Sequence, residues 1–94
     1  MKVLVCCANG AGTSLMMEMK VKQAFKELGK QAEVSHTSLS EGKNTSRFYD
    51  AVICCTAFVN NFKDAQDRGV KVIGVKNILS VPEIKSKIEE SGLL

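Results

Sequence analysis

The sequence predicts an α/β fold, with an open, mainly parallel sheet of four strands and three helices packed on both of its faces. Short apolar runs alternate along the chain with amphipathic helical patterns, which is typical of parallel strands connected through helices. The runs at residues 2–6 and 51–55 are apolar on both faces, as in strands that helices cover on both sides. The chain has 94 residues, which suits one core, so residues 1–94 are expected to form a single domain.

The first half of the chain is expected to provide two strands and a long helix. Residues 2–6 are the first strand, and residues 31–35, whose alternation is weaker, are an edge strand. Residues 14–28 carry apolar side chains at helical spacing, and Gly29 lies where a C-terminal cap belongs. The apolar positions of this helix are Met17, Val21, Ala24, Phe25 and Leu28.

Residues 37–50, TSLSEGKNTSRFYD, stand where a crossover helix normally connects two parallel strands. This segment is too polar to bury a good helical face, so a loop is expected there. Its two aromatic residues, Phe48 and Tyr49, are expected to pin the loop to the core.

The second half of the chain is expected to alternate strand and helix. Residues 51–55 are a central strand and residues 71–75 are the last strand. Residues 58–68 form a helix between them, which ends at Gly69. The apolar positions of this helix are Phe58, Phe62 and Ala65.

A third helix is expected to begin at Ser80. Ser80 and Glu83 have the spacing of a capping box, and Pro82 stands in the first turn. Its apolar face consists of Ile84 and Ile88, and Gly92 ends it.

The two most apolar strands should be central, so the expected strand order is 2-1-3-4, a Rossmann-like arrangement. In such sheets ligands bind beyond the carboxyl ends of the strands, where the strand order reverses. Here that point lies between the first and third strands, whose ends carry Cys7 and Thr56. The candidate site is therefore expected at this edge of the sheet, with Thr56 as a candidate pocket residue.

The segment CCANGAGTS, residues 6–14, joins the first strand to the first helix. A helix N-terminus offers unpaired N–H groups and a partial positive charge to an anion. The small residues 10–12 permit close backbone approach, and the hydroxyl of Thr13 or Ser14 can cap the helix. Because the same field lowers the pKa of a nearby thiol, Cys7 is predicted to be a nucleophilic thiolate facing an anion cradle.

The spacing of this loop is close to that of the tyrosine-phosphatase signature. That signature has Cys, five residues, Arg and then Ser or Thr, whereas Cys7 is followed after the same interval by Thr13 and Ser14. Without the Arg, a phosphocysteine could still be held by backbone N–H groups, but its hydrolysis would lack electrostatic help. A thiol that accepts phosphate and does not readily release it to water suits a phosphate relay.

The stretch VCCANGAGTSLMMEMKV, residues 5–21, resembles the phosphorylation loop and first helix of the IIB component of the bacterial phosphoenolpyruvate-dependent sugar phosphotransferase system. The similarity is to the ascorbate-type branch of the lactose/ascorbate/galactitol IIB group. The segments CCTAF (54–58) and IGVKNILS (73–80) resemble that branch too. Cys6 stands where the branch carries an apolar residue, whereas Cys7 keeps the family's spacing to the Asn-Gly pair. The resemblance implies the fold of the low-molecular-weight phosphatases.

The resemblance also implies a mechanism and partners. A phosphohistidine on a IIA protein would donate phosphate to Cys7, and Cys7 would pass it to a sugar-like substrate held by a membrane-embedded IIC transporter. The closest branch suggests L-ascorbate as that substrate, and the reaction requires no cofactor. The residues implied to bind the phosphoryl group are Ala8, Asn9, Gly10, Ala11, Gly12, Thr13 and Ser14.

Residues outside the loop receive simpler interpretations. Cys6, Cys54 and Cys55 are expected to be packing residues. Met16 and Met19 lie off the main apolar face of the first helix, which fits either a second buried flank or a docking surface for IIA or IIC. The only histidine, His36, is expected to be a solvated loop residue, and no metal site is expected.

The composition excludes several other functions. The net charge is only +3, and the chain holds four Phe, one Tyr and no Trp, so nucleic-acid binding is not expected. No apolar stretch approaches the ~18 residues of a membrane span, and no signal peptide is expected. We therefore expect a cytoplasmic protein that meets the membrane through IIC. Two alternatives remain open: a low-molecular-weight phosphatase-like enzyme, and a non-catalytic redox or metal module built on the four cysteines.

Overall fold

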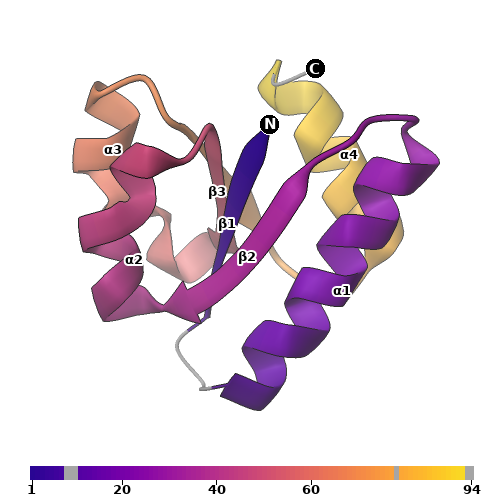
Figure 1. Ribbon diagram of the computed structural model, residues 1–94, viewed down its shortest axis with the longest axis horizontal. Coiled ribbons are helices and arrows are strands. Elements are labelled where there is room, and N and C mark those ends of the chain that lie inside the picture. The colour runs from indigo at the N-terminus through magenta and orange to yellow at the C-terminus, as the bar shows by residue number, and fades with distance from the viewer. Residues whose placement is uncertain (8–10, 78, 93–94) are drawn as a thin grey trace.

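In the described residues, four parallel strands form one sheet between two layers of helices (Figure 1). The computed structural model describes residues 1–7, 11–77 and 79–92, with the backbone alone for residues 7, 11–14 and 39. The strands are β1 (Lys2–Cys7), β2 (Glu33–Ser38), β3 (Ala51–Cys55) and β4 (Lys71–Val75). The helices are α1 (Ala11–Glu27), α2 (Leu39–Thr45), α3 (Lys63–Asp67) and α4 (Val81–Ser91), with 3₁₀ segments η1 (Ser46–Phe48) and η2 (Thr56–Phe62).

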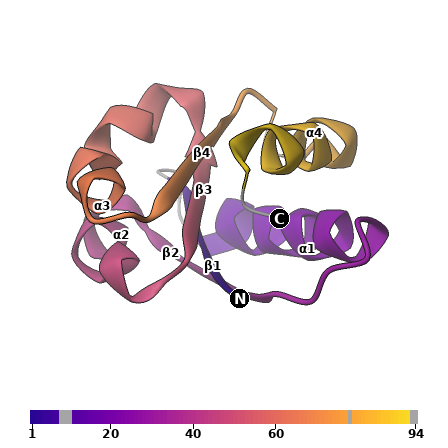
Figure 2. The ribbon, with the colours of Figure 1, turned by 90° about the horizontal axis from the view of Figure 1, so that it is seen from above.

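The strand order is β2-β1-β3-β4, which confirms the order predicted from the sequence. Figure 2 shows α1 and α4 on one face of the sheet and α2 and α3 on the other. Side chains of β1 alternate between these faces, since Val3 and Val5 pack under α1 and α4 whereas Leu4 and Cys6 pack under α2 and α3. Both faces of the central strands are therefore buried, which is why residues 3–6 and 51–54 are apolar.

Several element boundaries differ from the prediction. Helix α1 begins at Ala11 instead of residue 14, so the whole segment GTS belongs to its first turn. Strand β2 covers Glu33–Ser38 instead of residues 31–35. The predicted helix at residues 58–68 is divided into η2 and α3.

The expectation of a loop over residues 37–50 is wrong, because α2 and η1 occupy most of this segment. The N-cap of this helix is Ser38, whose Oγ accepts a hydrogen bond from the Glu41 N–H at 3.3 Å. Its buried contact is made by Gly42, which packs so closely on Cys6 that a Cβ there would overlap the sulfur. A helix that packs on the core through a glycine needs no row of apolar side chains. The polarity of the segment therefore does not predict whether it is helical.

The prediction for the two aromatic residues of this segment is confirmed for one of them and wrong for the other. Tyr49 packs against the core under α2 and α3, as expected, whereas Phe48 is 65% exposed and does not pin the segment. With α2 included, the structure has four α-helices in its described residues instead of three.

Helix α4 begins and ends as predicted, but its capping box is only half formed. The Ser80 Oγ accepts from the Glu83 N–H at 3.4 Å, and Gly92 ends the helix with φ of 76°. The Glu83 carboxylate turns back to the segment after β4, where it accepts from the backbone N–H of Lys76 at 2.6 Å and of Asn77 at 3.1 Å. Glu83 therefore ties the end of β4 to the start of α4.

Candidate functional site

The carboxyl edge of the sheet places Cys7 at the point where the strand order reverses. In the β1–β2 register Cys7 lies opposite Ser38, the last residue of β2. In the β1–β3 register Val5 lies opposite Ile53, so Cys7 and Cys55 each end their strand two residues further on. The backbone of Cys7 thus ends a central strand with a neighbouring strand on each side, where ligands bind in open α/β sheets.

Helix α1 begins at this same edge (Figure 1). Its first residue, Ala11, follows Cys7 by four positions. The first four N–H groups of a helix have no partner within it, and its N-terminus carries about half a positive charge. No acidic residue stands in the first turn of α1. The backbone of this turn therefore provides hydrogen-bond donors and a favourable electrostatic field for an anion. No carboxylate in the same turn competes with that anion.

The structure brings together only part of the predicted phosphate loop. Ala11, Gly12, Thr13 and Ser14 form the first turn of α1, directly beyond the end of β1. Ala8, Asn9 and Gly10 lie outside the described residues. The anion site stays a prediction, and the structure describes the backbone of its helical half.

Two of the other cysteines are core residues, as predicted. Cys6 and Cys54 are fully buried in the core under α2 and α3. Burial, with a smaller contribution from the neighbouring Cys55, raises the pKa of the Cys54 thiol to about 12, so this thiol stays protonated at neutral pH. A protonated, buried thiol is a poor nucleophile.

Cys55 and Thr56 lie at the carboxyl end of β3. Cys55 is only partly buried and, by strand alternation, points to the opposite face from Cys54. Thr56 is exposed at the start of η2, where it and Val59 pack over Gly74 of β4 so closely that a Cβ on Gly74 would crowd both. Thr56 therefore lies at the predicted edge, with its methyl group turned toward β4.

Met16 and Met19 are both exposed, so their interpretation as a second buried flank of α1 is wrong. Their exposed fractions are 51% and 60%, and the neighbouring Leu15 is 48% exposed. These three residues, which we call the α1 apolar patch, occupy the half of α1 that begins at the carboxyl edge of the sheet.

His36 is a residue whose environment differs from the prediction. It lies within β2, and its Nδ1 is 3.0 Å from Oε1 of Glu18 on α1. Oε2 of Glu18 lies 3.6 Å from the Nζ of Lys22. These contacts join α1 to the edge strand, and no signal in the sequence pairs residues 18 and 36.

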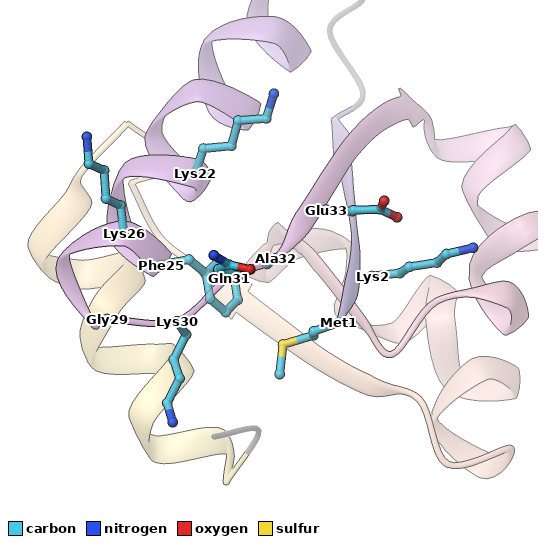
Figure 3. A pocket seen from close by; sticks show the side chains of 10 residues that line it. All are labelled: Met1, Lys2, Lys22, Phe25, Lys26, Gly29, Lys30, Gln31, Ala32 and Glu33. Atoms are coloured by element: carbon cyan, nitrogen blue, oxygen red, sulfur yellow. The ribbon is translucent and has the colours of Figure 1, made fainter.

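A hollow on the described surface lies away from this edge. It has a volume of about 800 Å³ and lies beside the end of α1 and the starts of β1 and β2 (Figure 3). Its lining includes Lys2, Lys22, Lys26 and Lys30, and none of the candidate site residues. We call it the lysine groove.

The described residues also bear on the other functions considered. They contain no group of three or more His, Cys, Asp or Glu side chains arranged to hold a metal ion. None of the helices in the described part of the chain is long and apolar enough to span a membrane.

A parallel sheet whose central strand ends beside a helix N-terminus is an arrangement in which α/β proteins bind phosphate-bearing ligands. The family model described as "PTS system, Lactose/Cellobiose specific IIB subunit" matches residues 2–90. The chain belongs to this family and is therefore an EIIB phosphotransferase component of a sugar-transporting phosphotransferase system.

Individual relatives agree with this assignment. The chain is 30% identical to the "Ascorbate-specific PTS system EIIB component" of Mycoplasma pneumoniae, over 94% of this chain and 90% of the relative. It is 28% identical to the protein of the same description from Salmonella typhimurium, over 95% and 86%. The lactose-specific IIB domain structure from Streptococcus pneumoniae superposes with a TM-score of 0.68 at 18% identity, covering 97% of this chain and 89% of that one. This last similarity supports the fold.

Proposed function

We propose that Cys7 is the residue that carries the phosphoryl group. One observation supports this most strongly: Cys7 ends a central strand at the reversal point of the sheet, and α1 begins four residues later. The buried Cys6 and Cys54 belong to the core, which leaves Cys7 and Cys55 as the cysteines at this edge. Of these two, only Cys7 is followed within four residues by the start of a long helix.

The reaction consists of two phosphoryl transfers. The Cys7 thiolate attacks the phosphorus of a phosphohistidine on a IIA protein, the P–N bond breaks, and the histidine nitrogen leaves with the electron pair and takes up a proton. A hydroxyl oxygen of the substrate held by IIC then attacks the same phosphorus. The P–S bond breaks, the thiolate is restored, and the hydroxyl proton passes to solvent.

The N-terminus of α1 is suited to both steps. Its free N–H groups and partial positive charge favour the thiolate before transfer and the phosphoryl oxygens after it. The residues proposed to bind these oxygens are Ala8 to Ser14. Position 13 holds Thr where a phosphatase carries Arg, so hydrolysis of the phosphocysteine lacks a stabilising cation.

The substrate proposed for the complete system is a sugar-like molecule, with L-ascorbate as the particular candidate. The support is that the relatives of this chain are described as ascorbate-specific, at 28–30% identity. The partners are a IIA donor and a membrane IIC transporter, which the family implies. Residues 1–94 act as one phosphocarrier domain in the cytoplasm, at the inner face of the membrane. The α1 apolar patch and Thr56, which lie toward the carboxyl edge of the sheet, are the proposed docking surface for a partner.

The test is phosphorylation of the purified chain by phosphoenolpyruvate, the general phosphotransferase proteins and a IIA partner, followed by intact-mass measurement. We expect one added phosphoryl group, absent in Cys7→Ser and retained in Cys55→Ser, which removes the other cysteine at the same edge. Phosphorylation of Cys7→Ser would contradict the assignment. Multiple turnover of p-nitrophenyl phosphate would instead support the phosphatase-like alternative.

A further inference from the structure

A second cleft lies between α2 and α3, on the other side of the sheet from α1. Figures 1 and 2 both show these two helices side by side. The cleft has a volume of about 160 Å³ and is lined by residues from the end of α2, from η1 and from α3. Arg47 precedes β3 and Arg68 precedes β4, so the cleft lies at the amino end of the sheet, away from Cys7.

Both arginines of the chain line this cleft. Only these two of the 13 basic residues of the chain are arginines, and the others are lysines. The cleft is therefore the one place on the chain where guanidinium groups gather. Lys43 adds a third positive charge, and Asp64 is the single acidic lining residue. Among the described residues, neither arginine nor Lys43 forms an ion pair within the chain.

The structure gives one side-chain contact for Arg47 and backbone contacts for Arg68. The Arg47 guanidinium lies 4.9 Å from the centre of the ring of Phe48, which is itself exposed. The Arg68 backbone N–H donates to the carbonyl oxygens of Asp64 and Ala65, at 3.2 and 3.0 Å. Beside Arg47, Ser46 is only 2% exposed and lines the same cleft.

We propose that this cleft binds a small phosphate-bearing anion, either inorganic phosphate or a phosphate monoester. Guanidinium groups present a planar fork of donors that matches phosphate oxygens. The volume of about 160 Å³ is smaller than the ~300 Å³ at which drug-sized pockets begin, so the cleft suits a small anion better than a larger ligand. The proposal concerns a site separate from Cys7 and independent of the phosphoryl transfer.

The lysine groove provides a contrast. Figure 3 shows the ammonium groups of Lys2, Lys22, Lys26 and Lys30 pointing in different directions around an open hollow. Such a surface raises the local concentration of anions without defining a place for one of them. The arginine cleft differs in its small size and its forked donors.

A different explanation assigns the cations near the ends of α2 and α3 to compensation of the helix dipoles. Under that explanation lysine would serve as well as arginine, and no saturable anion site would exist. The arginine-to-lysine exchange therefore distinguishes the two explanations while it preserves the net charge.

The experiment is a titration of the isotope-labelled chain with inorganic phosphate at constant ionic strength, followed residue by residue in amide NMR spectra. We expect saturable shifts at the Ser46, Arg47 and Arg68 amides. The double variant Arg47→Lys/Arg68→Lys should bind about tenfold more weakly, the effect of losing one charge-assisted hydrogen bond. Asp64→Asn should bind more tightly, because it removes the one carboxylate of the lining.

The matched control is Lys26→Ala/Lys30→Ala, which removes two exposed charges from the lysine groove and should leave the cleft affinity unchanged. Unchanged spectra away from the substitutions would show that each variant is folded. Shifts that grow without saturation, or shifts confined to residues 8–14, would overturn the proposal. Equal affinity of the lysine double variant would do the same.

Discussion

Adjacent cysteines in this chain have different chemistry because strand alternation places them in different surroundings. Cys54 is fully buried with the pKa of its thiol raised to about 12, whereas Cys55 is only partly buried at the carboxyl edge. A reactive thiol needs its ionised form and access to solvent. Alkylation of the folded protein at neutral pH is therefore expected to modify Cys55 well before Cys54, as peptide mass analysis would show. Comparable modification of both would contradict the burial argument.

The shifted thiol of Cys54 also makes stability depend on pH. The pKa rises from 9.0 to about 12, so between these values the folded chain keeps a proton that the unfolded chain releases. The free energy of unfolding must then fall as the pH rises through this window. Urea unfolding at increasing pH should show this decrease, and Cys54→Ala should reduce its slope. The control Cys55→Ala should retain it, and an unchanged slope in Cys54→Ala would show that other groups cause the decrease.

At the scale of single elements, α2 depends on the absence of a side chain at position 42. A Cβ on Gly42 would overlap the Cys6 sulfur and come within 3.5 Å of the Phe62 ring. Gly42→Ala is expected to destabilise the fold by about 1–3 kcal/mol, as overpacking of a core does. Urea unfolding measures this change, and Lys43→Ala on the exposed side of the same helix is the control.

A double-mutant cycle separates this overlap from other effects of the substitution. Cys6→Ala leaves a small cavity, which the new methyl group of Gly42→Ala would partly fill. The double variant should therefore lose less stability than the sum of the single losses. Additive losses would show that the two positions are not in contact.

The segment after β4 depends on Glu83 of α4. Its carboxylate accepts two backbone N–H groups, those of Lys76 and Asn77. Glu83→Ala should cost about 1–3 kcal/mol, because both donors lose a charged acceptor. Glu90→Ala serves as the control, since Glu90 is an exposed residue of the same helix that pairs with Lys87 at 3.6 Å. Hydrogen exchange at Lys76 and Asn77 should accelerate in Glu83→Ala alone.

At the scale of the whole molecule, the strand order of the sheet was predictable from the sequence. Some of the helices and contacts that cover the sheet were not. Central strands are buried on both faces, so residues 3–6 of β1 and all of β3 are apolar, and the places of these strands in the sheet follow. Helix α2 is buried through Gly42, and Glu18 meets His36 only after α1 packs on β2. These contacts depend on tertiary geometry, which has no periodic signal in the sequence.

The same limit applied to the candidate site. Topology and the small residues after β1 indicated the carboxyl edge, and the start of α1 there agrees with them. The arginine cleft was not apparent, because Arg47 and Arg68 are distant in sequence and meet only when α2 and α3 pack on the same face. Residues gathered from separate elements require the assembled fold to be recognised.

Substitutions near the two ends of α1 should affect phosphoryl transfer differently. The α1 apolar patch lies toward the Cys7 end, and Met16 and Met19 within it are more than half exposed. Exposed methionines adapt to a partner surface and contribute little to the stability of the free chain. Met16→Ser/Met19→Ser should therefore raise the KM for the phosphorylated IIA donor, with unfolding free energy changed by no more than about 0.5 kcal/mol per site.

Removal of charge at the opposite end provides the comparison for this last prediction. Lys26→Ala/Lys30→Ala should leave the KM for the donor unchanged, because these lysines lie beside the end of α1 that is remote from Cys7. Initial rates of chain phosphorylation at varied IIA concentration give both values. An equal rise in KM for the two double variants would indicate that the donor is attracted by overall positive charge. A rise restricted to the methionine variant would place the donor on α1 beside Cys7, the residue proposed to receive its phosphate.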